Sequence, residues 1–204
     1  MRPWEHFFKD KITQLFNQGG VIIDVGGGLR VIKEKGNRYD SSREWIRPLI
    51  KKTDYKILDI VNTYHPDIVG DIQHLSFENN SVDAVICIAV LQHVERPHDA
   101  LNEIYRVLKP GGHVFLYVPF LYYYHGQSGY YKDYWRFTED SLRLISKQFA
   151  KFEIVHVRGA IETWIKLSPL GRWGFMNNLA YLFDKISGKI KTKQVSGYNI
   201  FLTK

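Results

Sequence analysis

Short apolar runs alternate with helical patterns through the middle of the chain. Runs of the length of buried strands occupy residues 21–25, 56–58, 68–69, 84–88 and 114–118. Between the last two, "RPHDALNEIYRVLKPGG" has apolar residues at helical spacing, and its Pro-Gly-Gly ending predicts where the helix stops. This alternation predicts an α/β fold with a mostly parallel, Rossmann-like sheet.

Both ends of the chain extend this pattern. An apolar stripe at helical spacing in residues 1–20 predicts a helix that covers the sheet. "TEDSLRLISKQF" predicts a helix capped by Thr138, and "FEIVHVRG" and "GYNIFLTK" predict two final strands. Residues 160–194 between those strands are too many for a hairpin connection and predict an insert. No composition shift marks a second domain, so we expect one domain over residues 1–204.

The composition narrows the class of protein. Hydrophobic residues make up 45% of the chain, which excludes a disordered protein. The only cysteine, Cys87, lies in an apolar run, so we expect it to be buried and reduced, in a cytoplasmic protein without disulfides. The net charge of +7 comes from dispersed lysines and arginines, which are more typical of a solvated surface than of a nucleic-acid stripe.

The stretch "VIIDVGGGLR" reads as a strand that turns into a nucleotide-binding loop. Gly26 and Gly28 fit the first two positions of the dinucleotide pattern Gly-x-Gly-x-x-Gly, but Val31 stands at the third. The glycines therefore predict a loop without identifying its ligand.

Acidic residues give a sharper indication of the ligand. Asp24, Asp59 and Asp71 each stand at or just beyond the end of a predicted strand, and ligands bind at the carboxyl ends of parallel strands. A carboxylate beside the glycine loop opposes a pyrophosphate and favours a cationic group. S-adenosylmethionine has an ammonium and a sulfonium and no phosphate. Asp59 can accept from its ribose hydroxyls, and Asp71 from its adenine amino group.

Residues 21–149 resemble a class I S-adenosylmethionine-dependent methyltransferase of the type-11 group, which includes quinone-biosynthesis methyltransferases. "IIDVGGG" is similar to the family's first motif, "ILDI" to its second, and "VGDIQHLSFENNSVDAVICIAVLQHVERPHDALNEIYRVLKPGGHVFLYVP" to its third through fifth. The resemblance implies a mostly parallel seven-stranded sheet with helices on both faces and an antiparallel C-terminal strand.

The resemblance also implies cofactor contacts along the strand ends, with S-adenosylhomocysteine as the product. The residues concerned are Asp24, Gly26, Gly27 and Gly28 at the methionyl part, Asp59 at the ribose, Ile60, Asp71 and Ile72 at the adenine, and Ile88 beneath the cofactor. The chain departs from the family in having Arg30 where a further glycine is common. It also has a longer interval before Asp59, which predicts an extended loop over residues 33–48.

The acceptor side is predicted from residues 120–138, which are rich in tyrosine. A hydroxyl or carbon acid that receives a methyl group must lose a proton, and His125 or His93 is the candidate base. Aromatic side chains can stack on a sugar or another ring, and an arginine can bind an anion. The candidate substrate-binding residues are Tyr124, Tyr134, Trp135 and Arg136. A folded-back aromatic lid explains the same composition.

The insert at residues 160–194 is apolar and aromatic and has a basic end. It predicts a cap over the site, a dimer face, or an interfacial segment that approaches a lipid-linked substrate at the inner membrane face. In the last case the apolar anchors are Trp164, Trp173 and Phe183, and the basic residues are Lys189, Lys191 and Lys193.

Four functions remain open at this point. The leading one is methyl transfer to a small-molecule or glycan acceptor, which can be lipid-linked, with oxygen as the expected atom. An NAD-dependent dehydrogenase is disfavoured by Asp24 and Val31. A nucleic-acid amino-methyltransferase is disfavoured because "IAVLQHV" replaces an Asn/Asp-Pro-Pro-Tyr motif. A protein that keeps the cofactor and lacks catalysis is the fourth.

Overall fold

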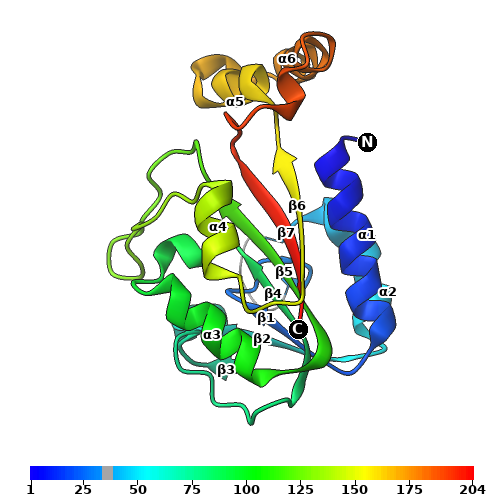
Figure 1. The fold of residues 1–204 in the computed structure, drawn as a ribbon, viewed down its shortest axis with the longest axis vertical. Coiled ribbons are helices and arrows are strands. Elements are labelled where there is room, and N and C mark those ends of the chain that lie inside the picture. The colour runs from blue at the N-terminus through cyan, green and yellow to red at the C-terminus, as the bar shows by residue number, and fades with distance from the viewer. Residues whose placement is uncertain (34–38) are drawn as a thin grey trace.

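A seven-stranded sheet lies at the centre of the computed structural model, which describes residues 1–33 and 39–204 (Figure 1). The strand order is β3-β2-β1-β4-β5-β7-β6. β7 runs antiparallel to both neighbours, and the other neighbouring strands are parallel. The predicted fold class is confirmed. The strands are β1 (Val21–Val25), β2 (Asp54–Asp59), β3 (Ile68–Val69), β4 (Val82–Ile88), β5 (Leu108–Pro119), β6 (Lys151–Val157) and β7 (Gly197–Thr203).

Helices cover both faces of the sheet, as Figure 1 shows: α1 and α2 lie on one side, and α3 and α4 on the other. In the described part of the chain, none of the helices has the length and apolar character needed to cross a membrane. The α-helices are α1 (Pro3–Gln18), α2 (Arg47–Ile50), α3 (Pro97–Val107), α4 (Glu139–Ile145), α5 (Ala160–Leu167) and α6 (Gly174–Ile186), and short 3-10 turns include η2 (Ser41–Ile46), η3 (Asn62–Tyr64) and η4 (Leu91–His93).

Alternation along the strands divides the core between the two faces. Ile86 of β4 belongs to the cluster beneath α1, where Ile12 and Leu15 are fully buried. Its neighbour Cys87 belongs to the cluster beneath α3, around Ile104. Successive side chains of a strand point to opposite faces, so one strand supplies both clusters. The covering helix in residues 1–20 and the burial of Cys87 are confirmed.

The end of α3 differs from its predicted position. The helix ends at Val107, and the Pro-Gly-Gly sequence lies inside β5, which already begins at Leu108. A Cβ on Gly112 would lie 2.9 Å from the carbonyl oxygen of Asp83, so glycine lets β5 approach β4 closely there. The glycines therefore serve strand pairing here and do not terminate the helix.

Arg106 fixes the segment that follows β3 and leads into β4. Its guanidinium donates to the carbonyl oxygens of Leu75 and Phe77, each at 2.8 Å, and to Asn79 Oδ1 at 2.8 Å. It also forms paired bonds to Glu103 at 2.7 and 2.8 Å. One helical side chain therefore holds the backbone that leads into the amino end of β4.

We predict that Arg106→Ala lowers the free energy of unfolding by about 1–3 kcal/mol, because two backbone carbonyls and a carboxylate lose their donor. Urea unfolding followed by circular dichroism measures this change. The control is Arg96→Ala, which removes an exposed pair with Asp99 at 3.2 Å and should change stability by less than about 0.5 kcal/mol. Equal effects of the two substitutions would contradict the role given to Arg106.

Candidate cofactor and acceptor site

A large open cleft lies at the carboxyl edge of the sheet, where the glycine loop and the ends of β2, β3 and β4 meet the tyrosine-rich segment 120–138. Gly27 lines a smaller hollow beside it, together with Arg30 and Asp59. The structure thus brings most of the predicted site residues to one surface. Those lining the cleft are Gly26, Gly28, Asp59, Ile60, Asp71, Ile72, Ile88, His93, Tyr124, His125 and Tyr134.

Asp24 is placed differently from the direct cofactor contact expected from the sequence. It is fully buried, and its carboxylate accepts the backbone N–H groups of Gly28 and Leu29, each at 3.0 Å. The Tyr55 hydroxyl donates to it at 2.6 Å. Burial raises the pKa of Asp24 to about 6. The carboxylate therefore shapes the loop from behind and places a negative charge beneath it at neutral pH.

The backbone N–H groups of the glycine loop are all used within the protein. Gly26 donates to the Leu58 carbonyl at 2.7 Å, Gly27 to the Asp24 carbonyl at 3.4 Å, and Arg30 to the Gly27 carbonyl at 3.1 Å. The N–H groups of Gly28 and Leu29 donate to the Asp24 carboxylate. A phosphate-binding loop needs N–H groups that point at the ligand. Between Gly26 and Arg30, every backbone N–H group already has an acceptor within the protein, so none is available to a phosphate.

Two arginines complete the loop. Arg30 has a left-handed backbone with φ of 56°, a conformation that glycine adopts without strain, which explains why the family commonly has glycine there. Arg43 from η2 donates to the Gly28 carbonyl at 2.6 Å and so ties the loop to the following segment. The extended loop predicted over residues 33–48 is described at residue 33 and from residue 39 onward, where it forms η2 and the start of α2; residues 34–38 lie outside the described residues.

The next two strand ends carry the carboxylates predicted for the adenosine. Asp59 is partly buried at the end of β2, where burial raises its pKa, and it accepts the Val61 N–H at 3.2 Å. Ile60 beside it is 59% exposed, so an apolar surface faces the cleft. Asp71 accepts the Gln73 N–H at 2.9 Å. Both carboxylates are thus oriented by the backbone that follows them.

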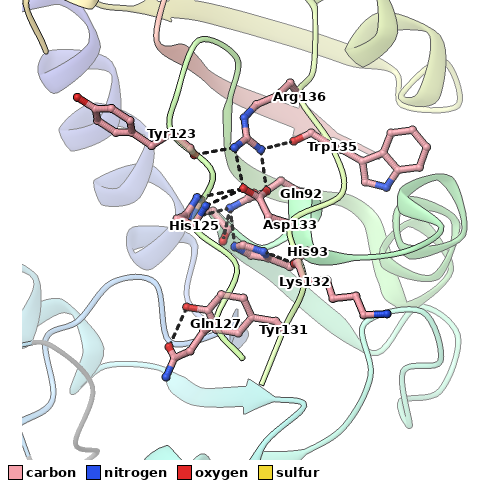
Figure 2. A network of polar contacts seen from close by, with 11 residues as sticks. Gln92, His93, Tyr123, His125, Gln127, Tyr131, Lys132, Asp133, Trp135 and Arg136 are labelled. Atoms are coloured by element: carbon pink, nitrogen blue, oxygen red, sulfur yellow. Dashed lines mark hydrogen bonds and ion pairs between the residues drawn. The ribbon is translucent and has the colours of Figure 1, made fainter. Parts of the chain in front are cut away.

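Figure 2 shows the polar network on the acceptor side, in which His93 is tightly held. Its Nδ1 lies 2.7 Å from the Lys132 carbonyl oxygen and must therefore carry the proton. Its Nε2 then accepts from the Gln92 side-chain amide at 3.0 Å. Burial lowers the pKa of His93, which keeps the ring neutral at neutral pH. Both ring nitrogens are occupied, so His93 supports the site.

His125 lies beside an ionised carboxylate at the edge of the cleft. Its backbone N–H donates to Asp133 Oδ2 at 2.9 Å, and its Nδ1 lies 3.6 Å from the same oxygen. Arg136 holds Asp133 with bonds of 2.6 and 2.7 Å and is the main reason why the pKa of Asp133 falls to about 2. A permanently ionised carboxylate beside Nδ1 favours the tautomer with Nε2 free to accept a proton. The ring is one-third exposed and lines the cleft.

Arg136 and Trp135 are placed away from the positions expected of substrate-binding residues. The two terminal nitrogens of Arg136 donate to Asp133 and to the carbonyls of Trp135 and Tyr123, at 2.6–2.8 Å. The Trp135 indole donates to the Val94 carbonyl at 2.8 Å. Neither residue lines the cleft. These polar groups are satisfied inside the segment, and the anion contact predicted for Arg136 has no terminal N–H left to make it.

The tyrosines divide into cleft-lining and bracing residues. Tyr124 and Tyr134 both line the cleft; Tyr124 is 73% exposed, and the Tyr134 hydroxyl is held by a hydrogen bond that it donates to Glu95 at 2.8 Å. Tyr130 stacks on Tyr64 of η3 with a centroid distance of 6.5 Å, which connects the tyrosine-rich segment to the end of β2. The segment therefore spans the cleft from the histidines to the adenosine side.

Several supporting residues were missed from the sequence, and Gln92 is the most informative. It is fully buried, and its amide nitrogen donates to the Ala89 carbonyl at 2.8 Å as well as to His93. The same nitrogen lies 3.5 Å from Nε2 of His125. Tyr55, Arg43 and Asp133 likewise act on predicted residues from distant positions. Such contacts depend on how the chain folds and leave no periodic signal in the sequence.

Comparisons with known proteins indicate a methyltransferase domain. Residues 42–116 match a family model described as a methyltransferase domain. A ubiquinone/menaquinone biosynthesis C-methyltransferase from Ruegeria sp. (strain TM1040) is 30% identical over 117 residues, which are 54% of this chain and 46% of that protein. A malonyl-[acyl-carrier protein] O-methyltransferase from Marinomonas sp. (strain MWYL1) is 27% identical over 48% of this chain and 37% of that protein. The matches thus span less than half the length of these relatives.

Similarity to known proteins extends over more of the chain in the fold than in the sequence. The crystal structure of a SAM-dependent methyltransferase from Archaeoglobus fulgidus superposes with a TM-score of 0.59, covering 96% of this chain and 90% of that one at 14% identity. At this identity the superposition shows a shared fold. Together with the matching domain, it shows that this chain resembles the class I S-adenosylmethionine-dependent methyltransferases of the type-11 group, in fold over most of its length and in sequence over residues 42–116.

Proposed function

We propose that this chain binds S-adenosylmethionine in the cleft and transfers its methyl group to an acceptor that enters beside His125. The observation that carries the proposal is the glycine loop, whose N–H groups are all bonded internally above the buried Asp24 carboxylate. Such a loop attracts a cation and has no donors for a pyrophosphate. S-adenosylmethionine, the family's cofactor, is cationic at its methionyl end.

The residues lining the cleft fit the rest of this cofactor. Asp59 would accept from the ribose hydroxyls, and the exposed Ile60 side chain would pack against the adenine. Asp71 and Ile72 would contact the adenine edge, while Gly26, Gly28 and Ile88 would surround the methionyl part. When bound, the cofactor supplies an activated methyl group on its sulfonium. The protein's own contribution is to orient the acceptor and receive its proton.

The acceptor side favours a small molecule or glycan, which can be lipid-linked, with oxygen as the atom methylated. His125 Nε2 would take the proton of an acceptor hydroxyl, and ionised Asp133 would stabilise the imidazolium that forms. Tyr124 offers an exposed aromatic face for a sugar or other ring. The relatives include both C- and O-methyltransferases, so the identity of the acceptor is a proposal from the site alone.

The other functions fit less well. An NAD-dependent dehydrogenase would need to place a diphosphate against the loop above Asp24, where the backbone amides are occupied. A protein that only binds the cofactor does not require an ionised carboxylate, here Asp133, beside a histidine that lines the cleft, here His125. The cytoplasmic location, with contact to the inner membrane face, is part of the proposal and is developed below.

The first test concerns the ribose contact. We predict that Asp59→Ala weakens S-adenosylmethionine binding by more than about tenfold, because an ionised acceptor of two hydroxyl groups is lost. Isothermal titration calorimetry measures the affinity. The control is Asp54→Ala at the other end of the same strand, where the carboxylate pairs with the exposed Lys56. This variant should bind S-adenosylmethionine as tightly as the unaltered protein does. Unchanged affinity in Asp59→Ala would refute the assignment.

The second test uses the charge beneath the loop. Asp24 is ionised above its pKa of about 6 and becomes neutral below it. The sulfonium is attracted only to the ionised form, so the affinity for S-adenosylmethionine relative to neutral S-adenosylhomocysteine should fall severalfold, about three- to tenfold, from pH 7.5 to 5. Asp24→Asn should make this ratio independent of pH. Two results would show that Asp24 does not attract the sulfonium. One is an affinity ratio that rises as the pH falls, and the other is an equal pH dependence of the ratio in the unaltered protein and in Asp24→Asn.

The third test concerns the base. We predict that His125→Ala lowers methyl transfer about a hundredfold, since general-base catalysis is lost, while cofactor affinity is nearly unchanged. Transfer of labelled methyl from S-adenosylmethionine to fractionated cell extract provides the assay, and its labelled product identifies the acceptor. His98→Ala, on the exposed side of α3, is the matched control. Loss of cofactor binding in His125→Ala would instead make the residue structural.

A further inference from the structure

α5 and α6 form a helical hairpin that stands beyond the end of the sheet, at the top of Figure 1. Its base contacts the N-terminal end of the chain. Arg2 pairs with Glu162 at 3.2 Å and donates to Asn178 at 3.0 Å, and Trp4 meets Tyr181 edge to face with a centroid distance of 5.9 Å. The remaining faces of the hairpin are open to solvent.

The exposed face of α6 is its apolar face. Phe175, Leu179, Leu182, Phe183 and Ile186 recur at spacings of four, three, one and three residues, which places them on one stripe of a helix. Their exposed fractions run from 43% to 74%. A surface helix of a globular protein normally turns such a stripe toward the core, and α6 does the reverse.

The opposite side of α6 holds the residues that face the protein. Ala180 and Asp184 are buried, and the Asp184 carboxylate accepts the N–H groups of Ile161 and Glu162 at 2.9 and 2.8 Å. This carboxylate therefore joins the two helices of the hairpin. The orientation of α6 is fixed by these contacts, and the apolar stripe faces outward as a result.

Other apolar side chains extend the stripe into one surface, which we call the hairpin surface. Trp164 of α5 is 68% exposed, and Trp173 stacks on Phe175 with an interplanar angle of 18°. Scattered exposed apolar residues are normal, but a contiguous group of aromatic and aliphatic side chains marks an interaction site. The hairpin surface consists of Trp164, Leu170, Trp173, Phe175, Leu179, Leu182, Phe183 and Ile186.

Charge is segregated in the same segment. The only two acids in residues 160–194 are Glu162 and Asp184, and both are buried. The exposed charged side chains are all cations: Arg172, Lys185, Lys189, Lys191 and Lys193. Lys193 lies 3.8 Å from the exposed carboxylate of Asp140. The hairpin surface is thus apolar and aromatic, and the exposed charges of the segment that carries it are positive.

We propose that the hairpin surface binds an anionic lipid membrane. Aromatic and aliphatic side chains on one helical face enter the boundary between headgroups and acyl chains, and each lysine near the surface is attracted to anionic lipids. A second copy of this chain fits less well, because its own cations would face those of the first. A zwitterionic membrane would use the apolar side chains and leave the cations without a partner.

The hairpin lies next to the cleft. The cleft lining reaches Val157 and Arg158, directly before α5, and Trp4 at the base of the hairpin. The Tyr123 hydroxyl of the tyrosine-rich segment donates to the Lys166 carbonyl of α5 at 3.2 Å. Binding through the hairpin surface therefore brings the acceptor side of the cleft to the lipid surface. The membrane contact itself does not depend on methyl transfer.

Sedimentation of the full chain with phosphatidylcholine vesicles, with and without phosphatidylglycerol, tests the proposal. We expect binding to the vesicles that contain phosphatidylglycerol and little to phosphatidylcholine alone. Lys189→Glu with Lys191→Glu, and separately Phe183→Ser with Ile186→Ser, should each weaken binding about tenfold or more. The controls are Lys51→Glu with Lys52→Glu near α2, and Leu144→Ser, which is 66% exposed on α4; neither should change binding.

Three outcomes would overturn the proposal. The first is that the unaltered chain does not sediment with anionic vesicles. The second is that the hairpin and control variants lose vesicle binding equally. The third is that the unaltered chain is a dimer that does not bind lipid, and that sedimentation velocity shows the hairpin variants to be monomers. Circular dichroism and S-adenosylmethionine affinity are measured on every variant. Retained cofactor binding together with lost lipid binding separates this surface from the cofactor site.

Discussion

The cofactor side of this protein depends on one buried carboxylate. Asp24 lies near the end of the central strand β1, and its oxygens accept two backbone N–H groups of the glycine loop and the hydroxyl of Tyr55. Burying this group is unfavourable, as its raised pKa shows, but the bonds to the loop offset part of the cost. The result is a loop whose donors face inward and whose underlying charge is negative, which determines the kind of ligand the edge of the sheet can hold.

The acceptor side uses a second buried ion in a different way. Asp133 is held by Arg136, so its charge is balanced and its pKa is low, and this stable carboxylate stands beside His125. The two carboxyl groups thus differ in their environment: burial raises the pKa of Asp24, and the Arg136 guanidinium lowers that of Asp133. The strand ends position the cofactor side of the cleft, while the tyrosine-rich segment and its bond to α5 position the acceptor side.

The sequence predicted the sheet, the covering helix and the strand-end acids because each depends on local periodicity or on the topology of parallel strands. It placed Asp24 in direct contact with the cofactor because a motif records proximity along the chain but not which way a side chain points. It assigned Arg136 to an anion, since the pairing with Asp133 is a matter of three-dimensional packing in a segment without regular structure. Gln92 and Tyr55 carried no signal, and the outward apolar face of α6 could not be distinguished from a buried one by its spacing.

Direct titration of the unaltered full chain with S-adenosylmethionine and, separately, with NAD tests the central claim, that the Asp24-supported loop selects a cationic ligand over a pyrophosphate. The account predicts saturable binding of S-adenosylmethionine and none of NAD at the same concentrations. Binding of NAD without binding of S-adenosylmethionine would contradict it.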